Sequence, residues 1–207
     1  VSDVNRARRA TTVTILYRDS GDFHRNLLDL EAIERTLRSA QLRVATVTFD
    51  DLAFREQAAI MSRTAVFLAP HGAGLANTAF IPVCGVVIEV HSCGHVLSYF
   101  GTLAVNSGKH YLPWYDPRCG HPVHSQLRVQ DRVFPSVAAC TDSPVCRGSS
   151  RESPAFLNET QALGLAKEAL RMRCECLGRL ATPPQAPIAT RTSTSWVDPT
   201  TQCSTWP

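Results

Sequence analysis

A glycine-rich segment, APHGAGLAN at 69–77, carries the clearest chemical signal in the sequence. It follows the apolar run AVFLAP, which predicts a buried strand, and it opens a short helical stretch. The first backbone N–H groups of a helix have no partner within the helix, and Gly72 and Gly74 let a ligand approach them closely. His71 can donate a further hydrogen bond. The segment predicts a phosphate site, but a tight turn without a ligand fits the pattern equally well.

Two arginines and one glutamate extend this candidate site. Arg18 and Arg25 flank the polar loop after the first predicted strand. Ligands of open parallel sheets bind outside the carboxyl ends of the strands, so the two arginines are candidates for holding a diphosphate, or else ordinary surface residues. Glu89 falls within the apolar run VVIEV, where a buried acid needs a partner. It is either a hydrogen-bonded structural residue or an acceptor for a ribose hydroxyl.

Other chemical motifs are weak. HSCGH at 91–95 and CGHPVH at 119–124 gather cysteine and histidine, but their spacing fits no common zinc module, so we expect no metal site. Cys174 and Cys176 are two residues apart on a predicted helix and therefore face different directions, which is not the arrangement of a redox pair. The sequence contains neither a Gly-x-Ser-x-Gly nucleophile elbow nor a Walker loop.

Eight cysteines and one glycosylation acceptor sequence favour a secretory compartment. The acceptor is Asn158-Glu-Thr160, although Asn158 followed by Gln161 is also a helix N-cap pattern. Cys140 and Cys146 bracket a turn-forming segment, TDSPV, and we expect them to form a disulfide in an oxidising lumen and to be free thiols in a reducing compartment.

The elements that must position these residues alternate between strand and helix over residues 1–115. Strands are predicted at 12–17, 42–49, 65–70, 85–90 and 109–115, and helices at 26–39, 52–64 and within 98–108, the second capped by Asp50 or Asp51. This alternation predicts an α/β fold, a Rossmann-like parallel sheet with flanking helices.

The rest of the chain is predicted to be less regular. Residues 116–154 show no sustained period and predict an irregular Pro- and Cys-containing excursion. Residues 155–180 predict an amphipathic helix that packs on the domain, and 181–207 a disordered tail. The apolar face of that helix is predicted to contain Leu163, Ala166, Leu170, Cys174 and Leu177.

Composition excludes some functions. The 207 residues are 44% hydrophobic and carry a net charge of only +3, which favours a folded chain and argues against a nucleic-acid partner. No run of 18 apolar residues occurs, so a membrane anchor is expected only if one lies upstream. The chain opens with Val rather than Met, and we interpret it as a fragment or processed product.

The stretch from about 12 to 115 resembles the carboxy-terminal half of glycosyltransferase family 61, which includes plant xylosyl- and arabinosyltransferases and animal protein O-linked N-acetylglucosaminyltransferases. The resemblance rests on ILYR, on Arg25 with NLLDLE, on VTFDDLAFREQAAIMSRTAVFLAPHGAGLANTAFIPVCGVVIEV and on HYLPWY. It covers about half of the chain. Asp29 and Leu30 stand where the family usually has Asn-Glu, and the loop between the two arginines is longer by about three residues.

The resemblance implies specific site residues. The residues implied at the donor diphosphate are Arg18, Arg25, His71, Gly72, Ala73, Gly74, Leu75 and Asn77. Glu56 and Gln57 match the family's Glu-Gln and are expected to support the site from a helix.

The resemblance also implies one half of a GT-B architecture, with inversion at the anomeric carbon and no obligatory metal or other cofactor. The implied partners are a nucleotide-sugar donor of the uridine type, carrying xylose, arabinose or N-acetylglucosamine, and a glycan or glycoprotein acceptor. The catalytic base is expected in the missing half, and the implied location is the Golgi or endoplasmic reticulum. Donor-half catalysis would be stabilisation of the leaving diphosphate.

Two other functions remain open on the sequence. Gly72-x-Gly74 with Glu89 some 15 residues later imitates the fingerprint of a dinucleotide-dependent Rossmann oxidoreductase, but Asn77 takes the third glycine position and the motif follows the third strand. A non-catalytic remnant that acts as an interaction module is the second alternative.

Overall fold

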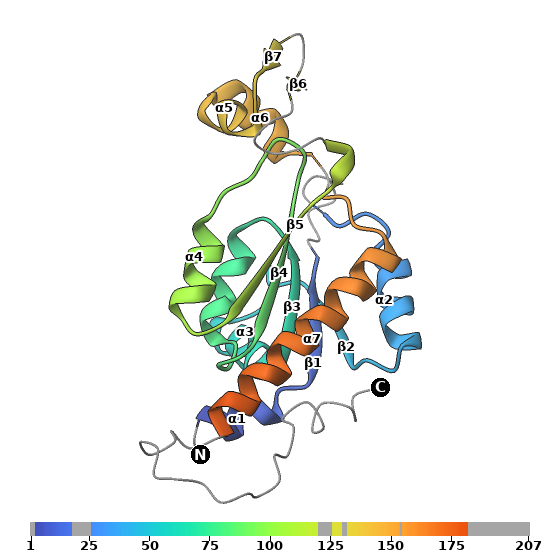
Figure 1. Ribbon diagram of the computed structural model, residues 1–207, viewed down its shortest axis with the longest axis vertical. Coiled ribbons are helices and arrows are strands. Elements are labelled where there is room, and N and C mark those ends of the chain that lie inside the picture. Colours follow the sequence, from blue (N-terminus) through green and yellow to red (C-terminus); the bar gives the residue numbers. More distant parts are fainter. Residues whose placement is uncertain (1–2, 18–25, 120–125, 130–131, 154, 182–207) are drawn as a thin grey trace, which may run out of the picture.

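Five strands form one parallel sheet in the order β2-β1-β3-β4-β5 (Figure 1). The computed structural model describes residues 3–17, 26–119, 126–129, 132–153 and 155–181. The strands are β1 Thr12–Leu16, β2 Val44–Val47, β3 Thr64–Pro70, β4 Val86–His91 and β5 His110–Tyr115. The predicted α/β, Rossmann-like sheet is confirmed. The strand order changes direction between β1 and β3, where ligands of such sheets commonly bind.

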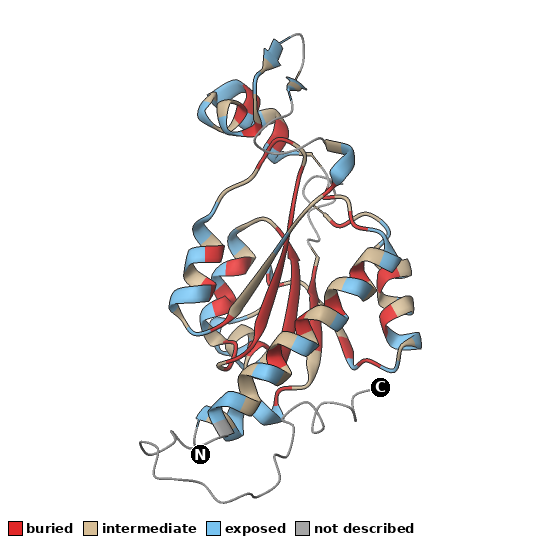
Figure 2. Ribbon diagram, in the orientation of Figure 1, coloured by how far each residue is buried: buried red, intermediate tan, exposed pale blue. Residues whose placement is uncertain are grey.

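Helices cover both faces of this sheet (Figure 1). One face carries α1 Asp3–Arg9, α2 Leu30–Ser39 and α7 Glu159–Ala181, and the other carries α3 Phe54–Met61, η1 Ala73–Phe80 and α4 Tyr99–Asn106. Every residue of β3 and β4 is buried, as Figure 2 shows, because helices lie on both sides of the central strands. The core is therefore divided by the sheet into two apolar layers.

The buried face of α7 differs from the predicted one. Ala162, Ala166, Ala169 and Arg173 are buried, whereas Leu163 and Leu170 are only partly buried. Alanines let the helix lie close to the sheet, and the leucines pack at the margins of the contact. Arg173 is 2% exposed and donates hydrogen bonds to the backbone carbonyl oxygens of Ala7 and Ala10. It therefore ties the end of α1 to α7.

The helix caps also differ from prediction. Neither Asp50 nor Asp51 caps α3; the Glu56 carboxylate accepts the Ala53 N–H at 2.9 Å and does so from within the helix. Asp50 instead accepts a hydrogen bond from the Thr48 hydroxyl. A carboxylate three residues into a helix can reach back to its first free N–H, which makes the upstream aspartates unnecessary.

Helix α2 begins four residues later than predicted. Its first residue is Leu30, because the backbone at Asn26 and Leu27 is extended and pairs with Ala155. That pairing joins the start of α2 to the segment leading into α7.

Residues 116–153 contain short regular elements where an irregular excursion was expected. They are η2 Pro117–Cys119, β6 Leu127–Val129, β7 Arg132–Phe134, α5 Val137–Asp142 and α6 Pro144–Arg151. The hydroxyl oxygens of Ser136 and Ser143 cap α5 and α6. Elements of three to eight residues show no detectable periodicity in a sequence. These elements lie beyond the carboxyl ends of the sheet strands (Figure 1).

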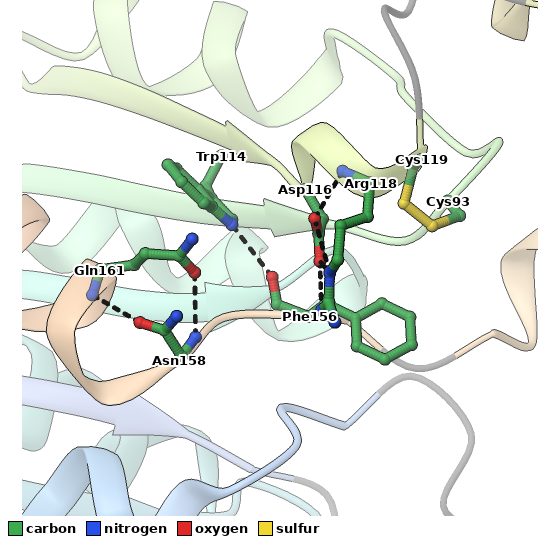
Figure 3. A network of polar contacts seen from close by, with 8 residues as sticks. All are labelled: Cys93, Trp114, Asp116, Arg118, Cys119, Phe156, Asn158 and Gln161. Carbon is green, nitrogen blue, oxygen red and sulfur yellow. Dashed lines mark hydrogen bonds and ion pairs between the residues drawn. A yellow bond between two sulfur atoms is a disulfide. The ribbon is translucent and has the colours of Figure 1, made fainter.

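A polar network anchors this region to the sheet (Figure 3). The Trp114 indole donates a hydrogen bond to the Phe156 carbonyl oxygen at 3.0 Å. Arg118 pairs with Asp116 and lies over the Phe156 ring, and its hydrogen bond is the main cause that lowers the pKa of Asp116. Asn158 and Gln161 exchange hydrogen bonds across the start of α7, so the N-cap pattern is confirmed.

Three disulfides have both cysteines within the described residues. Cys140 is joined to Cys146, as predicted, Cys93 to Cys119, and Cys84 to Cys176. The first links α5 to α6, and the last links the loop before β4 to α7. Within the described residues, no helix has the length and apolarity needed to span a bilayer. Residues 182–207, predicted to be disordered, lie outside the described residues.

Candidate functional site

A buried carboxylate holds the histidine of the glycine-rich turn. Glu89 lies on β4 beside Ala69 of β3, and it is fully buried. Its Oε1 lies 2.5 Å from Nδ1 of His71, the first residue after β3. The Tyr111 hydroxyl donates to Oε2 at 2.6 Å, and burial together with this bond raises the pKa of Tyr111. Glu89 is thus the hydrogen-bonded residue that the sequence left as one of two possibilities.

This contact sets how His71 can act. With Nδ1–H directed to the Glu89 carboxylate, the second ring nitrogen, Nε2, is left for a ligand. Nε2 accepts a hydrogen bond when the ring is neutral and donates one when the ring carries a second proton. A histidine held in this way can bind an anion or move a proton to a departing group.

Two further histidines surround His71. The ring of His91 stacks with it at a centroid distance of 5.7 Å, and the ring of His95 meets it edge-on at 4.9 Å. Burial is the main cause that lowers the pKa of both, to about 4 for His95, and the charges of Arg151 and Arg147 contribute to the shift of His95. Both rings are therefore neutral at pH 7.

The turn opens into a concave space, here named the His71 hollow, with a volume of about 630 Å³. The turn residues 71–73 line it together with His95 and Phe100. Helix α6 lines it as well, with Arg147 and Arg151. Its volume lies within the range of small-molecule sites. Tyr99, at the start of α4, is 63% exposed and lies at its edge.

The structure brings together only some of the predicted site residues. His71, Gly72 and Ala73 line the hollow, and Glu89 reaches it through His71. Gly74 and Leu75 face the core: a Cβ at Gly74 would lie 2.4 Å from Leu16 Cδ2, and Leu75 is fully buried. Close packing thus explains Gly74 without a ligand.

Asn77 also faces inward, where its side-chain amide donates to the Gln57 side chain at 2.9 Å. Gln57 in turn donates to the carbonyl oxygens of Phe49 and Leu52. The pair therefore joins η1 to α3 beneath the turn. Arg18 and Arg25 lie outside the described residues.

Sequence reasoning missed four residues of this site. His91 and His95 belong to HSCGH, whose spacing fits no common zinc module, and Cys93 of that segment forms a disulfide with Cys119. Arg147 and Arg151 line the hollow from the excursion predicted at 116–154, to which the sequence assigned no role. Their one-helical-turn spacing was the only available signal, and it is common on protein surfaces.

One group of side chains has the composition of a metal site. The ligand atoms of His71, Glu89 and His91 lie within 4.8 Å of one another, and two imidazoles with a carboxylate suit Zn²⁺. A cation there would have to replace the proton between His71 and Glu89. The arginines across the hollow add positive charge, which opposes a cation and favours an anion.

The fold and the turn define the class first: a Rossmann-like domain with a glycine-rich turn at the carboxyl edge of its sheet. The family model described as glycosyltransferase 61 matches residues 4–88. The resemblance to that family is thereby confirmed over residues 4–88.

Curated relatives agree with this match. The chain is 30% identical over 125 residues to the EGF domain-specific O-linked N-acetylglucosamine transferase of Bos taurus, covering 59% of this chain and 21% of that protein. Identity to the transferases of the same name is 34% over 125 residues in Gallus gallus, with the same coverage, and 34% over 105 residues in Xenopus laevis, covering 49% of this chain and 19% of that protein. The chain spans about a fifth of the length of these relatives.

Proposed function

We propose that this chain supplies the donor-binding half of a glycosyltransferase, holding the diphosphate of a nucleotide sugar in the His71 hollow. The observation that carries the proposal is the buried Glu89 carboxylate, which orients His71 at the mouth of a family 61 turn. This geometry suits a site that binds a negatively charged group. His71, Gly72 and Ala73 line the hollow in which that charge would lie.

The chemistry is stabilisation of the leaving group. When the bond between the anomeric carbon and the diphosphate breaks, negative charge grows on the phosphate oxygens. His71 would donate from Nε2 to one of these oxygens, and Glu89 would stabilise the charged ring. A base from the acceptor half would activate the hydroxyl that attacks, and the configuration would invert. The acceptor half belongs to the rest of a GT-B enzyme.

We further propose a uridine nucleotide, binding without a metal ion, and a protein or glycan acceptor. The transferase names of the relatives support an O-linked N-acetylglucosamine transfer most directly. The disulfides support the lumen of the secretory pathway. Glu89 counts against a dinucleotide oxidoreductase, because both of its oxygens already have partners within the protein.

Calorimetry in the presence of a chelator tests this function. We expect UDP and UDP-sugars to bind, and NAD to give no heat of binding. NAD binding without UDP binding would overturn the transferase proposal. Binding of neither nucleotide would leave the chain as an interaction module.

A further inference from the structure

Helix α6 brings two arginines to the His71 hollow from outside the family 61 segment. Arg147 and Arg151 are four residues apart, so they lie on one side of the helix. Gly148 lies between them and also lines the hollow. No atom lies within 4 Å of the place that a Cβ at Gly148 would occupy. The surface between the arginines is therefore open.

Acidic side chains do not neutralise these arginines within the hollow. None of its described lining residues is acidic. Arg151 has a contact of 3.7 Å with its neighbour Glu152, and both side chains are about half exposed, so that pair is weak. Arg147 donates to the Thr141 carbonyl oxygen at 3.3 Å. The part of the hollow that α6 lines is consequently positive.

The positive charge reaches the histidines. The Coulomb effects of Arg151 and Arg147 both act to lower the pKa of His95, which lies beside His71. A charge on α6 thus acts on the same space into which the His71 turn opens. An anion placed there would meet guanidinium groups on one side and His71 on the other.

Covalent and polar contacts hold α6 in this position. The Cys140–Cys146 disulfide joins it to α5, and the buried Ser150 hydroxyl lies 3.3 Å from the Cys140 sulfur. After α6, the Ser92 hydroxyl donates to the Ser153 carbonyl oxygen at 2.7 Å and so links this segment to the end of β4. The two arginines therefore belong to an ordered helix rather than to a loop.

We propose that Arg147 and Arg151 of α6 bind the diphosphate of the donor in the hollow that His71 also lines, as specificity-determining residues for a doubly phosphorylated nucleotide. This rests on the proposed function. Guanidinium groups form paired hydrogen bonds with phosphate oxygens. Two guanidinium groups one helical turn apart therefore match a diphosphate better than they match a single phosphate. A diphosphate would thus join the family segment to the disulfide-linked helix. Inorganic phosphate shares this chemistry and is separated from the nucleotide in the test.

The test compares R147Q/R151Q with R128Q/R132Q in the whole chain with its disulfides intact. The control pair removes the same charge from exposed positions on β6 and β7 that do not line the hollow. Calorimetry at low salt with UDP, UMP, uridine, pyrophosphate and phosphate gives the affinities. We expect R147Q/R151Q to weaken UDP and pyrophosphate binding at least tenfold, uridine binding to stay unchanged, and the control to match the unmodified chain. The variant R147K/R151K should recover part of the loss.

The outcomes separate the two proposals. If the chain binds UDP and R147Q/R151Q binds it equally well, the role of the arginines is overturned and the proposed function stands. If the chain binds pyrophosphate through the arginines but shows no preference for UDP, the arginine site stands and the nucleotide function fails. Binding of neither UDP nor pyrophosphate overturns both. Thermal unfolding of each variant checks that a loss of binding is not a loss of fold.

Discussion

At the scale of single residues, the proposed chemistry rests on the pairing of His71 with Glu89. An imidazole alone after a strand would be an ordinary polar residue. A fully buried carboxylate 2.5 Å from Nδ1 fixes its orientation and leaves its other nitrogen without that partner. The residue matters because of its partner, which lies 18 positions further along the chain.

His71→Ala tests this role directly. Removing the donor should weaken UDP binding by about 1 to 3 kcal/mol while the fold remains. We expect Arg18→Ala to weaken UDP binding by the same amount, as the family resemblance implies. Arg55→Ala, an exposed position on α3, is the matched control and should bind normally. Normal calorimetric binding by both site variants would place the ligand elsewhere.

Tyr111 is predicted to stabilise the fold through Glu89. In Tyr111→Phe the buried Oε2 loses its donor, which should lower the free energy of unfolding by about 1 to 3 kcal/mol. Tyr99→Phe is the control, because that ring is 63% exposed. Urea unfolding of the two variants measures the difference. An unchanged Tyr111→Phe would mean that Glu89 is satisfied in another way.

His95 should make stability depend on pH. Its folded pKa of about 4 lies below the ordinary value of 6.5, so the unfolded chain takes up a proton first as the pH falls. The free energy of unfolding should therefore decrease between pH 6.5 and 4, and His91 contributes in the same direction. Thermal melts across this range should show a smaller decrease for His95→Gln. An identical slope in the variant would contradict the assignment.

At the scale of elements, α4 holds the site in place through a glycine. Gly101 is buried in the middle of α4, and a Cβ there would lie 2.8 Å from the Tyr111 ring. The helix therefore lies against the tyrosine that donates to Glu89. Glycine weakens a helix, but it is tolerated at position 101 because the Tyr111 ring occupies the space that a side chain would need.

The two helical glycines Gly101 and Gly164 should respond oppositely to alanine. Gly101→Ala should destabilise the fold by about 1 to 3 kcal/mol through overpacking, despite its better helix propensity. Gly164→Ala on α7 meets no atom within 4 Å and should stabilise the fold by about 0.5 to 1 kcal/mol. Denaturant midpoints give both values. Stabilisation by Gly101→Ala would show that the Tyr111 ring can shift to make room for the added methyl group. The affinity of that variant for UDP would then show whether the shift disturbs the site.

At the scale of the whole molecule, disulfides join segments that the sheet does not. Cys84–Cys176 spans 92 positions and attaches α7 to the loop before β4, whereas Cys140–Cys146 spans six. A cross-link restricts the unfolded chain more when its loop is longer. The two bridges should thus differ in their effect on stability.

Replacing each pair by serine should measure that difference. In the chain-entropy treatment the loss is about 4 to 5 kcal/mol for Cys84 with Cys176 and about 2 kcal/mol for Cys140 with Cys146. Equilibrium unfolding of protein from a secretory host gives the values. Mass mapping of non-reduced peptides must first find Cys140 joined to Cys146. Free thiols at these positions would contradict both the bridge and the lumenal location.

The sequence by itself determined the sheet and the turn. Runs such as TVTIL, AVFLAP and VVIEV are apolar and rich in β-branched residues, and a run of this kind becomes a buried strand wherever the chain places it. The glycines and His71 carry their signal locally, and the Cys140–Cys146 bridge needed only a short turn. Such features depend on neighbours in the chain, which a sequence displays directly.

Only the tertiary structure decided which residues meet at the site. Glu89 contacts His71 because β4 pairs with β3 in one register, and a shift by one residue would turn the carboxylate to the other side of the sheet. Arg147 and Arg151 reach the hollow because α6 lies beyond the carboxyl ends of the strands, and Arg173 is buried because the end of α1 lies against it. These contacts join positions that are 18 residues apart for His71 and Glu89 and 163 residues apart for Ala10 and Arg173. Their energies depend on packing and exclusion of water, which no local pattern encodes.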